Sequence, residues 1–275
     1  MKGMAYRWFR LKRLLTHCSH MIYHWLFNRT FRQQRKHYKN IPIIIISYNQ
    51  LYYLKKLVEF LLEKGYRHLV ILDNNSNYPP LLDYLAAIES RVTVIRLDEN
   101  KGHLAFWKTA EVYKSYSKGY YVLTDPDVVP VDNCPENFLL TFRRLLDKAF
   151  DRTKVGFSLK LDDIPYTNPN KDHIERWESK FWSTKIHPLA FKAEIDTTFA
   201  LYRPRYRYRL KHFTKAWRTS YPLQARHGGW YFDVKNLTNE QTYYMKTAND
   251  SASWHIDAQG KLINVKHKSL YSNDA

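Results

Sequence analysis

Four short runs of large apolar residues, each followed by a polar loop, constrain the fold of this chain more than any other feature. The runs cover residues 41–46, 68–72, 92–97 and 120–124. Apolar runs of this length are typical of strands buried on both faces, as in a parallel sheet. The segments between them predict helices over residues 50–64, 79–89 and 104–116. This alternation predicts an α/β fold, in which a mostly parallel sheet is flanked by helices.

Polar residues follow each expected strand at the point where it ends. The four loops read Ser47-Tyr48-Asn49, Asp73-Asn74-Asn75-Ser76, Asn100-Lys101-Gly102 and Asp125-Pro126-Asp127. In open α/β sheets, ligands bind in the crevice beyond the carboxyl ends of the strands. Four polar loops in succession therefore predict a binding site at this edge of the sheet.

The last of these loops places two carboxylates, Asp125 and Asp127, one residue apart. Their mutual repulsion favours a bound cation, and Mg²⁺ and Mn²⁺ prefer such oxygen ligands. A cation there would also stabilise the charge on a departing diphosphate. The alternative interpretation is structural: Asp125 caps the following segment and Asp127 is solvated.

In their order, these motifs resemble the nucleotide-binding half of GT-A glycosyltransferases, particularly family 2 and its relatives of the bacterial surface-polysaccharide type. The resemblance covers residues 41–130 directly. It implies a GT-A, Rossmann-like fold and a nucleotide-sugar donor. Residues 131–275 then form the acceptor-binding half and the C-terminal region.

The resemblance also implies roles for individual residues. Asp125 faces the ribose or the metal, and Asp127 ligates the metal. Tyr48 and either Asp73 or Asn74 hold the base; many relatives have two adjacent acids at that place, so the base-contacting residue stays open. The residues expected at the donor are Ser47, Tyr48, Asn49, Asp73, Asn74, Asn100, Lys101, Gly102, Asp125 and Arg226.

The second half offers a candidate catalytic base. An inverting transfer needs a carboxylate to accept the proton of the acceptor hydroxyl, and inverting members of the family use an acid in this half. Asp196 is the first candidate, ahead of Glu194 and Asp163. A structural acid that caps a turn is the alternative, and a retaining transferase would need no such base.

Residues 226–231 form the other unusual cluster, with two adjacent glycines that allow a ligand to approach the backbone closely. Arg226 can pair with phosphate, and Trp230 offers a face for a sugar. In several GT-A enzymes a later histidine completes the metal shell. His227 is the candidate here, with His255 as the alternative.

Positive charge is concentrated in two stretches. The chain carries 44 Lys and Arg against 26 Asp and Glu, a net charge of +18. Residues 1–40 hold ten of these cations and no acid, and residues 203–218 are also free of acids. Such stretches attract anionic partners. The second stretch suits either a mobile loop that closes on the diphosphate or a surface that meets anionic lipid or an acidic glycan.

Apolar residues recur at helical spacing within residues 1–40. They are Trp8, Leu11, Leu15, Cys18, Ile22 and Trp25, called here the apolar stripe. Basic residues lie on the opposite side: Arg10, Arg13, His17, His20 and His24. A basic amphipathic helix of this kind is typical of docking at a membrane interface, where each cation near an anionic leaflet adds about 1 kcal/mol. Packing of the stripe on the main domain or a second subunit is the alternative.

The cysteines and the length of the apolar stretches indicate where in the cell the protein works. Two cysteines, Cys18 and Cys134, indicate a reducing cytoplasm, and no apolar stretch is long enough to span a bilayer. We therefore expect a cytoplasmic, peripheral membrane enzyme that moves a sugar from a nucleotide diphosphate sugar, such as a UDP-sugar, to a glycan or glycolipid such as lipopolysaccharide.

Two rival functions fit less of the sequence. A nucleotidyltransferase would carry a glycine-rich phosphate loop after its first strand, which residues 47–51 are not. A nucleic-acid-binding module would explain the charge but not the polar strand ends, so no nucleic-acid partner is expected. The oligomeric state stays open.

Overall fold

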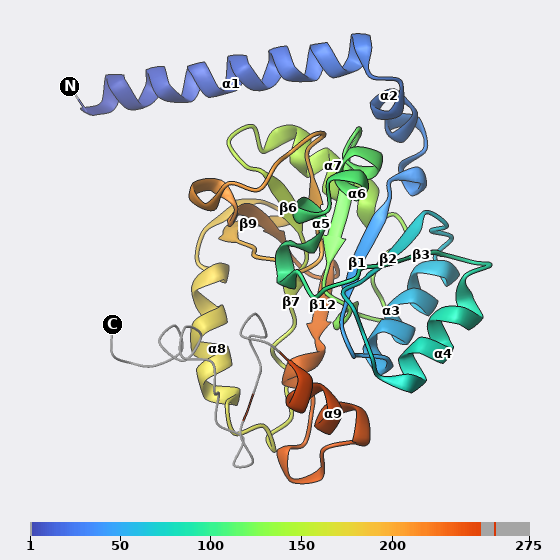
Figure 1. Cartoon of the computed structure of the whole chain (residues 1–275). Helices are drawn as coiled ribbons and strands as arrows, with labels where there is room; N and C mark the ends of the chain where they lie inside the picture. Colours follow the sequence, from blue (N-terminus) through green and yellow to red (C-terminus); the bar gives the residue numbers. More distant parts are fainter. Residues whose placement is uncertain (1, 249–255, 257–275) are drawn as a thin grey trace.

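A nine-stranded sheet forms the centre of the molecule (Figure 1). The computed structural model describes residues 2–248 and residue 256. The strand order is β3-β2-β1-β4-β10-β6-β11-β9-β8. Only β9 and β10 run against the direction of the other seven, so the sheet is mostly parallel, as expected. The bounds are β1 (Ile43–Ser47), β2 (Leu69–Asp73), β3 (Thr93–Arg96), β4 (Tyr121–Thr124), β6 (Lys154–Gly156), β8 (Lys185–His187), β9 (Ala190–Glu194), β10 (Ala200–Tyr202) and β11 (Lys215–Thr219).

Helices cover both faces of this sheet. In β1, Ile43 and Ile45 belong to the core on one face, while Ile44 and Ile46 belong to the core on the other. This alternation follows from the two-residue period of a strand and explains why the run is apolar throughout. The helices, including short 3₁₀ turns, are α2 (Arg29–Lys36), η1 (Tyr38–Asn40), α3 (Tyr52–Glu63), α4 (Pro79–Ile88), η2 (Gly102–Leu104), α5 (Ala105–Lys108), α6 (Ala110–Tyr116), α7 (Phe138–Lys148), α8 (Lys171–Ser179), η3 (Lys180–Trp182), η4 (Leu210–His212), η5 (Gly228–Trp230), η6 (Val234–Asn236) and α9 (Asn239–Thr247).

A second sheet has three strands, which come from distant parts of the chain. Its strands are β5 (Val128–Pro130), β12 (Gln224–His227) and β7 (Ser158–Leu159), in the order β5-β12-β7. Residues 155–161 do not form one strand, because β6 and β7 belong to different sheets. Buried Phe157 lies at the crossover.

Two further segments are interrupted, and Trp230 is buried. The helix expected over residues 104–116 breaks at Thr109, which has an extended backbone (φ −103°, ψ 96°). Residues 193–202 comprise the end of β9, a turn, and β10. Trp230 is 2% exposed and stacks on His227, so it offers no open face to a sugar.

The N-terminal segment is not uniform across residues 1–40. Helix α1 (Lys2–Phe27) lies along the outside of the domain at its upper end in Figure 1. Helix α2 instead packs into the domain: Phe31 is fully buried, and Gln34 pairs with both backbone groups of Tyr120 (2.9 and 2.7 Å). Only α1 therefore projects from the body. No helix in the described residues is long and apolar enough to cross a membrane.

Candidate functional site

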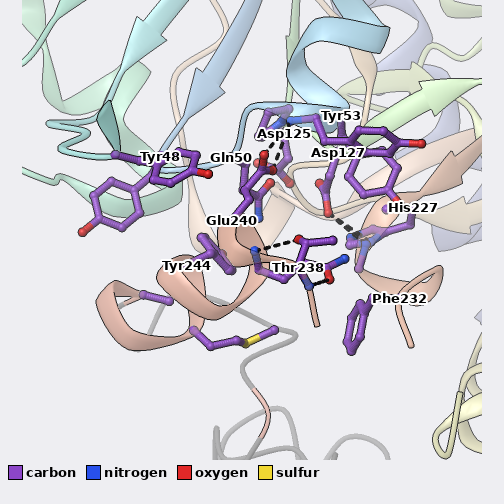
Figure 2. Close-up of a pocket in the computed structure, with 18 of the residues that line it drawn as sticks. Tyr48, Gln50, Tyr53, Asp125, Asp127, His227, Phe232, Thr238, Glu240 and Tyr244 are labelled. Atoms are coloured by element: carbon purple, nitrogen blue, oxygen red, sulfur yellow. Dashed lines mark hydrogen bonds and ion pairs between the residues drawn. The ribbon is translucent and has the colours of Figure 1, made fainter. Parts of the chain in front are cut away.

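A cleft of about 820 Å³ opens at the carboxyl ends of β1, β2 and β4 (Figure 2). Parallel strands bring their carboxyl ends to one edge, which is why loops more than 70 residues apart in the chain meet here. Seven of the predicted site residues line the cleft: Tyr48, Asn74, Asn100, Gly102, Asp125, Asp127 and His227. The other predicted residues lie behind its wall or beside it.

The turn after β1 shows how the chain places Tyr48. Asn49 adopts a left-handed backbone (φ 48°), which asparagine tolerates better than most residues. Its buried Oδ1 accepts hydrogen bonds from the backbone N–H groups of Asn77 and Tyr78 (2.9 and 3.0 Å). Asn49 and the fully buried Ser47 are thus scaffold, and Tyr48 is the residue of this motif that the cleft exposes.

In the loop after β2, one candidate residue is likewise buried and the other lines the cleft. Asp73 is fully buried and pairs with Arg96 (3.1 Å). Asn74 lines the cleft: its side chain donates to Asn100 Oδ1 (2.8 Å) and accepts from the backbone N–H of Lys101 (2.8 Å). Of the two residues that sequence reasoning left open, Asn74 is the one that a ligand in the cleft could touch.

The pairing of β5 with β12 brings His227 beside Asp127. Val128 and His227 are opposite each other in the antiparallel register, so the residue before β5 meets the end of β12. His227 Nδ1 lies 3.4 Å from Asp127 Oδ2, and both side chains line the cleft (Figure 2). The backbone N–H groups of Gly228 and Gly229 donate to the carbonyl and the carboxylate of Asp127 (2.7 and 3.2 Å).

Gly228 is required here because the backbone passes very close to α3. A Cβ atom at this position would lie 2.5 Å from the ring of Tyr53, a distance that real Cβ atoms do not reach. The glycine pair of residues 226–231 therefore allows a close approach of two backbone segments, where sequence reasoning expected the approach of a ligand.

Like charges are crowded at the bottom of the cleft. Burial and the neighbouring carboxylate of Asp127 raise the pKa of Asp125 well above its usual value. The hydroxyl of Thr197 donates to Asp125 Oδ2 (2.7 Å) and opposes this shift.

The residues present fit a divalent cation that shares its coordination with a ligand. In the described residues, no three His, Cys, Asp or Glu side chains form a group that could hold a metal ion by themselves. Asp127 and His227 supply two adjacent donors, one oxygen and one nitrogen, on side chains that line the cleft. A diphosphate could supply further oxygen ligands.

Asp196 lies in the turn between β9 and β10, next to the cleft wall formed by Thr197. Part of the residue is open to solvent, and its Oδ1 accepts a hydrogen bond from the backbone N–H of Thr198 (3.3 Å). Its backbone carbonyl accepts a hydrogen bond from the buried side chain of Lys154. Burial acts to raise the pKa of Asp196, but the nearby cations of Lys154 and Arg218 outweigh it and lower that pKa. The carboxylate is therefore ionised at neutral pH.

The remaining candidates are engaged elsewhere. Arg226 pairs with Asp163 (2.8 Å) and does not line the cleft. Glu194 accepts from the hydroxyl of Thr214 (3.1 Å). Lys101 points toward Glu99 (3.8 Å). His255, the alternative metal ligand, lies outside the described residues.

The acid-free stretch of residues 203–218 does not reach the cleft. The backbone N–H of Arg205 bonds the carbonyl of Ser117, which precedes β4, so this part lies at the amino edge of the sheet. Arg218, at the far end of the stretch, is buried against Glu178. The interpretation of the stretch as a loop that closes on the diphosphate is therefore wrong.

Comparison with known proteins agrees with these motifs. The family model "Glycosyl transferase family 2" matches residues 43–193, more than half of the chain. The chain belongs to glycosyl transferase family 2. It is therefore a glycosyltransferase with the GT-A fold of that family. The nucleotidyltransferase and nucleic-acid-binding alternatives do not explain this match.

Several solved structures are similar to this family 2 chain, at low sequence identity. The mannosyltransferase PcManGT from Pyrobaculum calidifontis, in complex with GDP-Man and Mn²⁺, is 14% identical; the match covers 89% of this chain and 73% of that one (TM-score 0.44). TarS of S. aureus is also 14% identical, over 68% and 60% of the two chains (TM-score 0.42). No curated protein sequence matches the chain.

Sequence reasoning missed the part of this family 2 site that α9 supplies. Glu240 lines the cleft and accepts from the backbone N–H groups of Leu51 and Tyr52 at the start of α3 (3.0 and 3.1 Å). The Tyr48 hydroxyl donates to the carbonyl of Thr247 (3.0 Å). A local signal was present, because Thr238 and Gln241 form a capping box that marks a helix start. That signal predicts a helix but not its partner.

Proposed function

We propose that this glycosyltransferase takes its sugar from a nucleotide diphosphate sugar, in a reaction that depends on Mn²⁺ or Mg²⁺. The observation that carries the proposal is the approach of Asp127 and His227 to 3.4 Å inside the cleft. When bound there, a divalent cation would stabilise the charge that develops on the departing diphosphate. A UDP-sugar is the donor we would test first.

The side chains at the cleft have separate roles in this proposal. Asp127 and His227 hold the cation, and Asp125 faces the ribose or the cation. Tyr48 and Asn74 form the wall on which the base rests, with Asn100 and Gly102 next to them. Ser47, Asn49 and Asp73 support these residues from behind.

Asp196 is the proposed base of an inverting transfer. Asp196 lies beside Thr197, which bonds Asp125, so a hydroxyl held there would be close to the donor. The ionised state of Asp196 suits proton acceptance. The acceptor is a glycan or glycolipid, and the second half of the chain, residues 131–275, supplies much of its site.

The proposal also includes attachment of the N-terminal segment to an anionic membrane surface. The ten cations and absent acids of residues 1–40 support this partner.

The test is a panel of nucleotide-sugars, assayed for binding and slow hydrolysis with Mn²⁺ and with chelator, on the protein and on Asp127→Ala. We expect one donor to bind only with the metal, and to lose binding in the variant. Binding that is equal with and without metal would show that the carboxylates have another role. If no nucleotide-sugar binds under either condition, the cleft is not a donor site.

A further inference from the structure

Helix α1 presents its apolar stripe to solvent and two of its histidines, His17 and His24, to the domain. Large apolar side chains along α1 that are at least 40% exposed are Tyr6, Trp8, Phe9, Leu11, Leu14, Leu15, Ile22, Tyr23, Trp25, Leu26 and Phe27. Most of the exposed large apolar residues in the described chain thus lie on this one helix. Isolated exposed apolar residues are normal, but a continuous set of this size marks an interaction surface.

Helix α1 contacts the domain through polar side chains and through Met21, which packs on the main core. His17 Nε2 lies 3.0 Å from the carbonyl of Asp147, and Arg203 approaches His17 Nδ1 (3.3 Å). His24 is 1% exposed and stacks on Phe31 of α2. His17, His20 and His24 are called here the histidine row. Because His17 and His24 contact the domain while the apolar stripe is exposed, the alternative in which the stripe packs on the chain's own domain is wrong.

The charge around α1 indicates which kind of partner covers the apolar stripe. Arg7, Arg10, Lys12 and Arg13 lie on α1, which has no acid. Arg205 lies in the adjoining part of the second acid-free stretch. A second copy of the chain would bring the same positive charge against this surface, whereas an anionic lipid surface complements both the charge and the apolar side chains.

The cleft lies at the other edge of the same sheet. The Asn28 side chain, just after α1, bonds the carbonyl of Lys118 (2.6 Å), and β4 leads from there to Asp125. An extended segment of this length spans about 20 Å, and the helix itself adds about 10 Å. In Figure 1, α1 lies at the top of the molecule and α9, which borders the cleft, at the bottom.

We infer that α1 attaches the enzyme to an anionic lipid bilayer with its cleft turned away from the membrane. The reacting hydroxyl would then stand about 30 Å from the surface that α1 touches. This deepens the proposed function, on which it rests for the identity of the cleft. It selects acceptors whose growing end extends well beyond the bilayer, such as a chain of sugars, over a single sugar on a lipid headgroup.

The first experiment measures binding to vesicles of phosphatidylcholine with and without phosphatidylglycerol. We expect binding only with the anionic lipid. Leu15→Asp places a charge in the stripe, whereas Thr16→Asp adds the same charge about 100° around the helix. One added negative charge weakens binding about five-fold, and loss of the buried leucine adds a further factor of about ten or more. We therefore expect a fifty-fold loss for Leu15→Asp and a five-fold loss for Thr16→Asp.

The second experiment measures orientation through the chain's own cysteines. Cys18 is exposed on α1, while Cys134 is buried, so a fluorophore attaches selectively to Cys18. A second protein carries Cys18→Ser and Lys235→Cys, which moves the label to exposed η6 beside the cleft. We expect strong energy transfer to a membrane dye from residue 18 and weak transfer from residue 235.

Three results would overturn the inference. Equal transfer from both labels would place the cleft at the membrane. Equal losses in Leu15→Asp and Thr16→Asp would remove the stripe from the contact. A stable dimer in solution that Leu15→Asp dissociates would make a second copy the occupant. All three leave donor binding in solution unaffected, so they are distinct from a failure of the proposed function.

Discussion

The two edges of the central sheet handle polar and apolar side chains in opposite ways. At the carboxyl edge, polar groups such as Asn74, Asp125 and Asp127 converge and are held by hydrogen bonds from neighbouring loops. At the amino edge, α1 directs apolar side chains outward and the histidine row inward. A hydrophobic core gathers apolar side chains and leaves polar ones at the surface. The carboxyl edge gathers polar side chains, and the amino edge leaves apolar ones exposed. We propose that one edge binds a small polar ligand and that the other meets an extended surface.

The largest effect is expected at the cleft, where removal of His227 should weaken metal binding. In His227→Ala we expect the affinity for Mn²⁺ in the presence of donor to fall about 100-fold, because one of two adjacent protein donors is lost. Isothermal titration of the metal into protein with donor measures this. His173→Ala on the exposed face of α8 is the matched control and should bind the metal normally. Unchanged metal affinity in His227→Ala would leave Asp127 without its proposed partner.

Lys154 tests whether the base is positioned from behind. Lys154→Met removes the ammonium that bonds the Asp196 carbonyl and should lower kcat about ten-fold with the donor Kd unchanged. Because Lys154 lowers the pKa of Asp196, its loss should raise that pKa and move the acid limb of the kcat profile to higher pH. Exposed Lys148→Met is the control. A parallel loss of donor affinity would instead indicate general damage to the cleft.

Gly228→Ala tests the close approach of η5 to α3. The new Cβ would meet the Tyr53 ring at 2.5 Å, so the free energy of unfolding should fall by about 1–3 kcal/mol. Urea denaturation measures this. In a Tyr53→Ala background the same change should cost much less. An equal cost in both backgrounds would locate the strain in the backbone and not in this contact.

At the opposite edge, acid should loosen α1. Burial lowers the pKa of each member of the histidine row. Arg203 adds to this at His17 and His20, although Asp147 acts against it at His17. At His24 the neighbouring His20 and then Arg205 add to burial, and the pKa falls to about 4. The domain contact thus favours neutral histidines. Its stabilisation is complete above about pH 6.5 and is lost as the pH falls toward 4.

Distances between spin labels at Cys18 and Lys235→Cys report this change. We expect a single narrow distribution at pH 7.5 and a broad one at pH 4.5. A variant with all three histidines replaced by asparagine should give the same distribution at both values. A wild-type distribution that does not change with pH would contradict the role given to the histidine row.

The smallest effect is expected within the apolar stripe, in the absence of lipid. Leu15 is 60% exposed, so Leu15→Asp should change the free energy of unfolding by no more than about 0.5 kcal/mol. Fully buried Ile45→Ala should cost about 2–5 kcal/mol in the same denaturation series. A large cost for Leu15→Asp would mean that the stripe packs on protein in solution.

The sequence alone determined the elements that depend on local pattern. Apolar runs such as residues 41–46 and 68–72 predicted strands, and polar residues after them predicted a site at one edge. The strands are confirmed, and the polar residues lie at one edge because parallel strands bring their carboxyl ends together wherever they occur. The stripe on α1 was equally visible, because helical spacing is a local property.

Only the tertiary structure decided which distant segments meet. The antiparallel register of β5 and β12 places His227 beside Asp127, a hundred residues apart in the chain. The tertiary structure also places Lys154 behind Asp196 and α9 across the cleft. Spacing along the chain fixes which face of an element a residue occupies, but not what packs against that face. The direction of α1 was undecided for the same reason, until the histidine row was found against the domain.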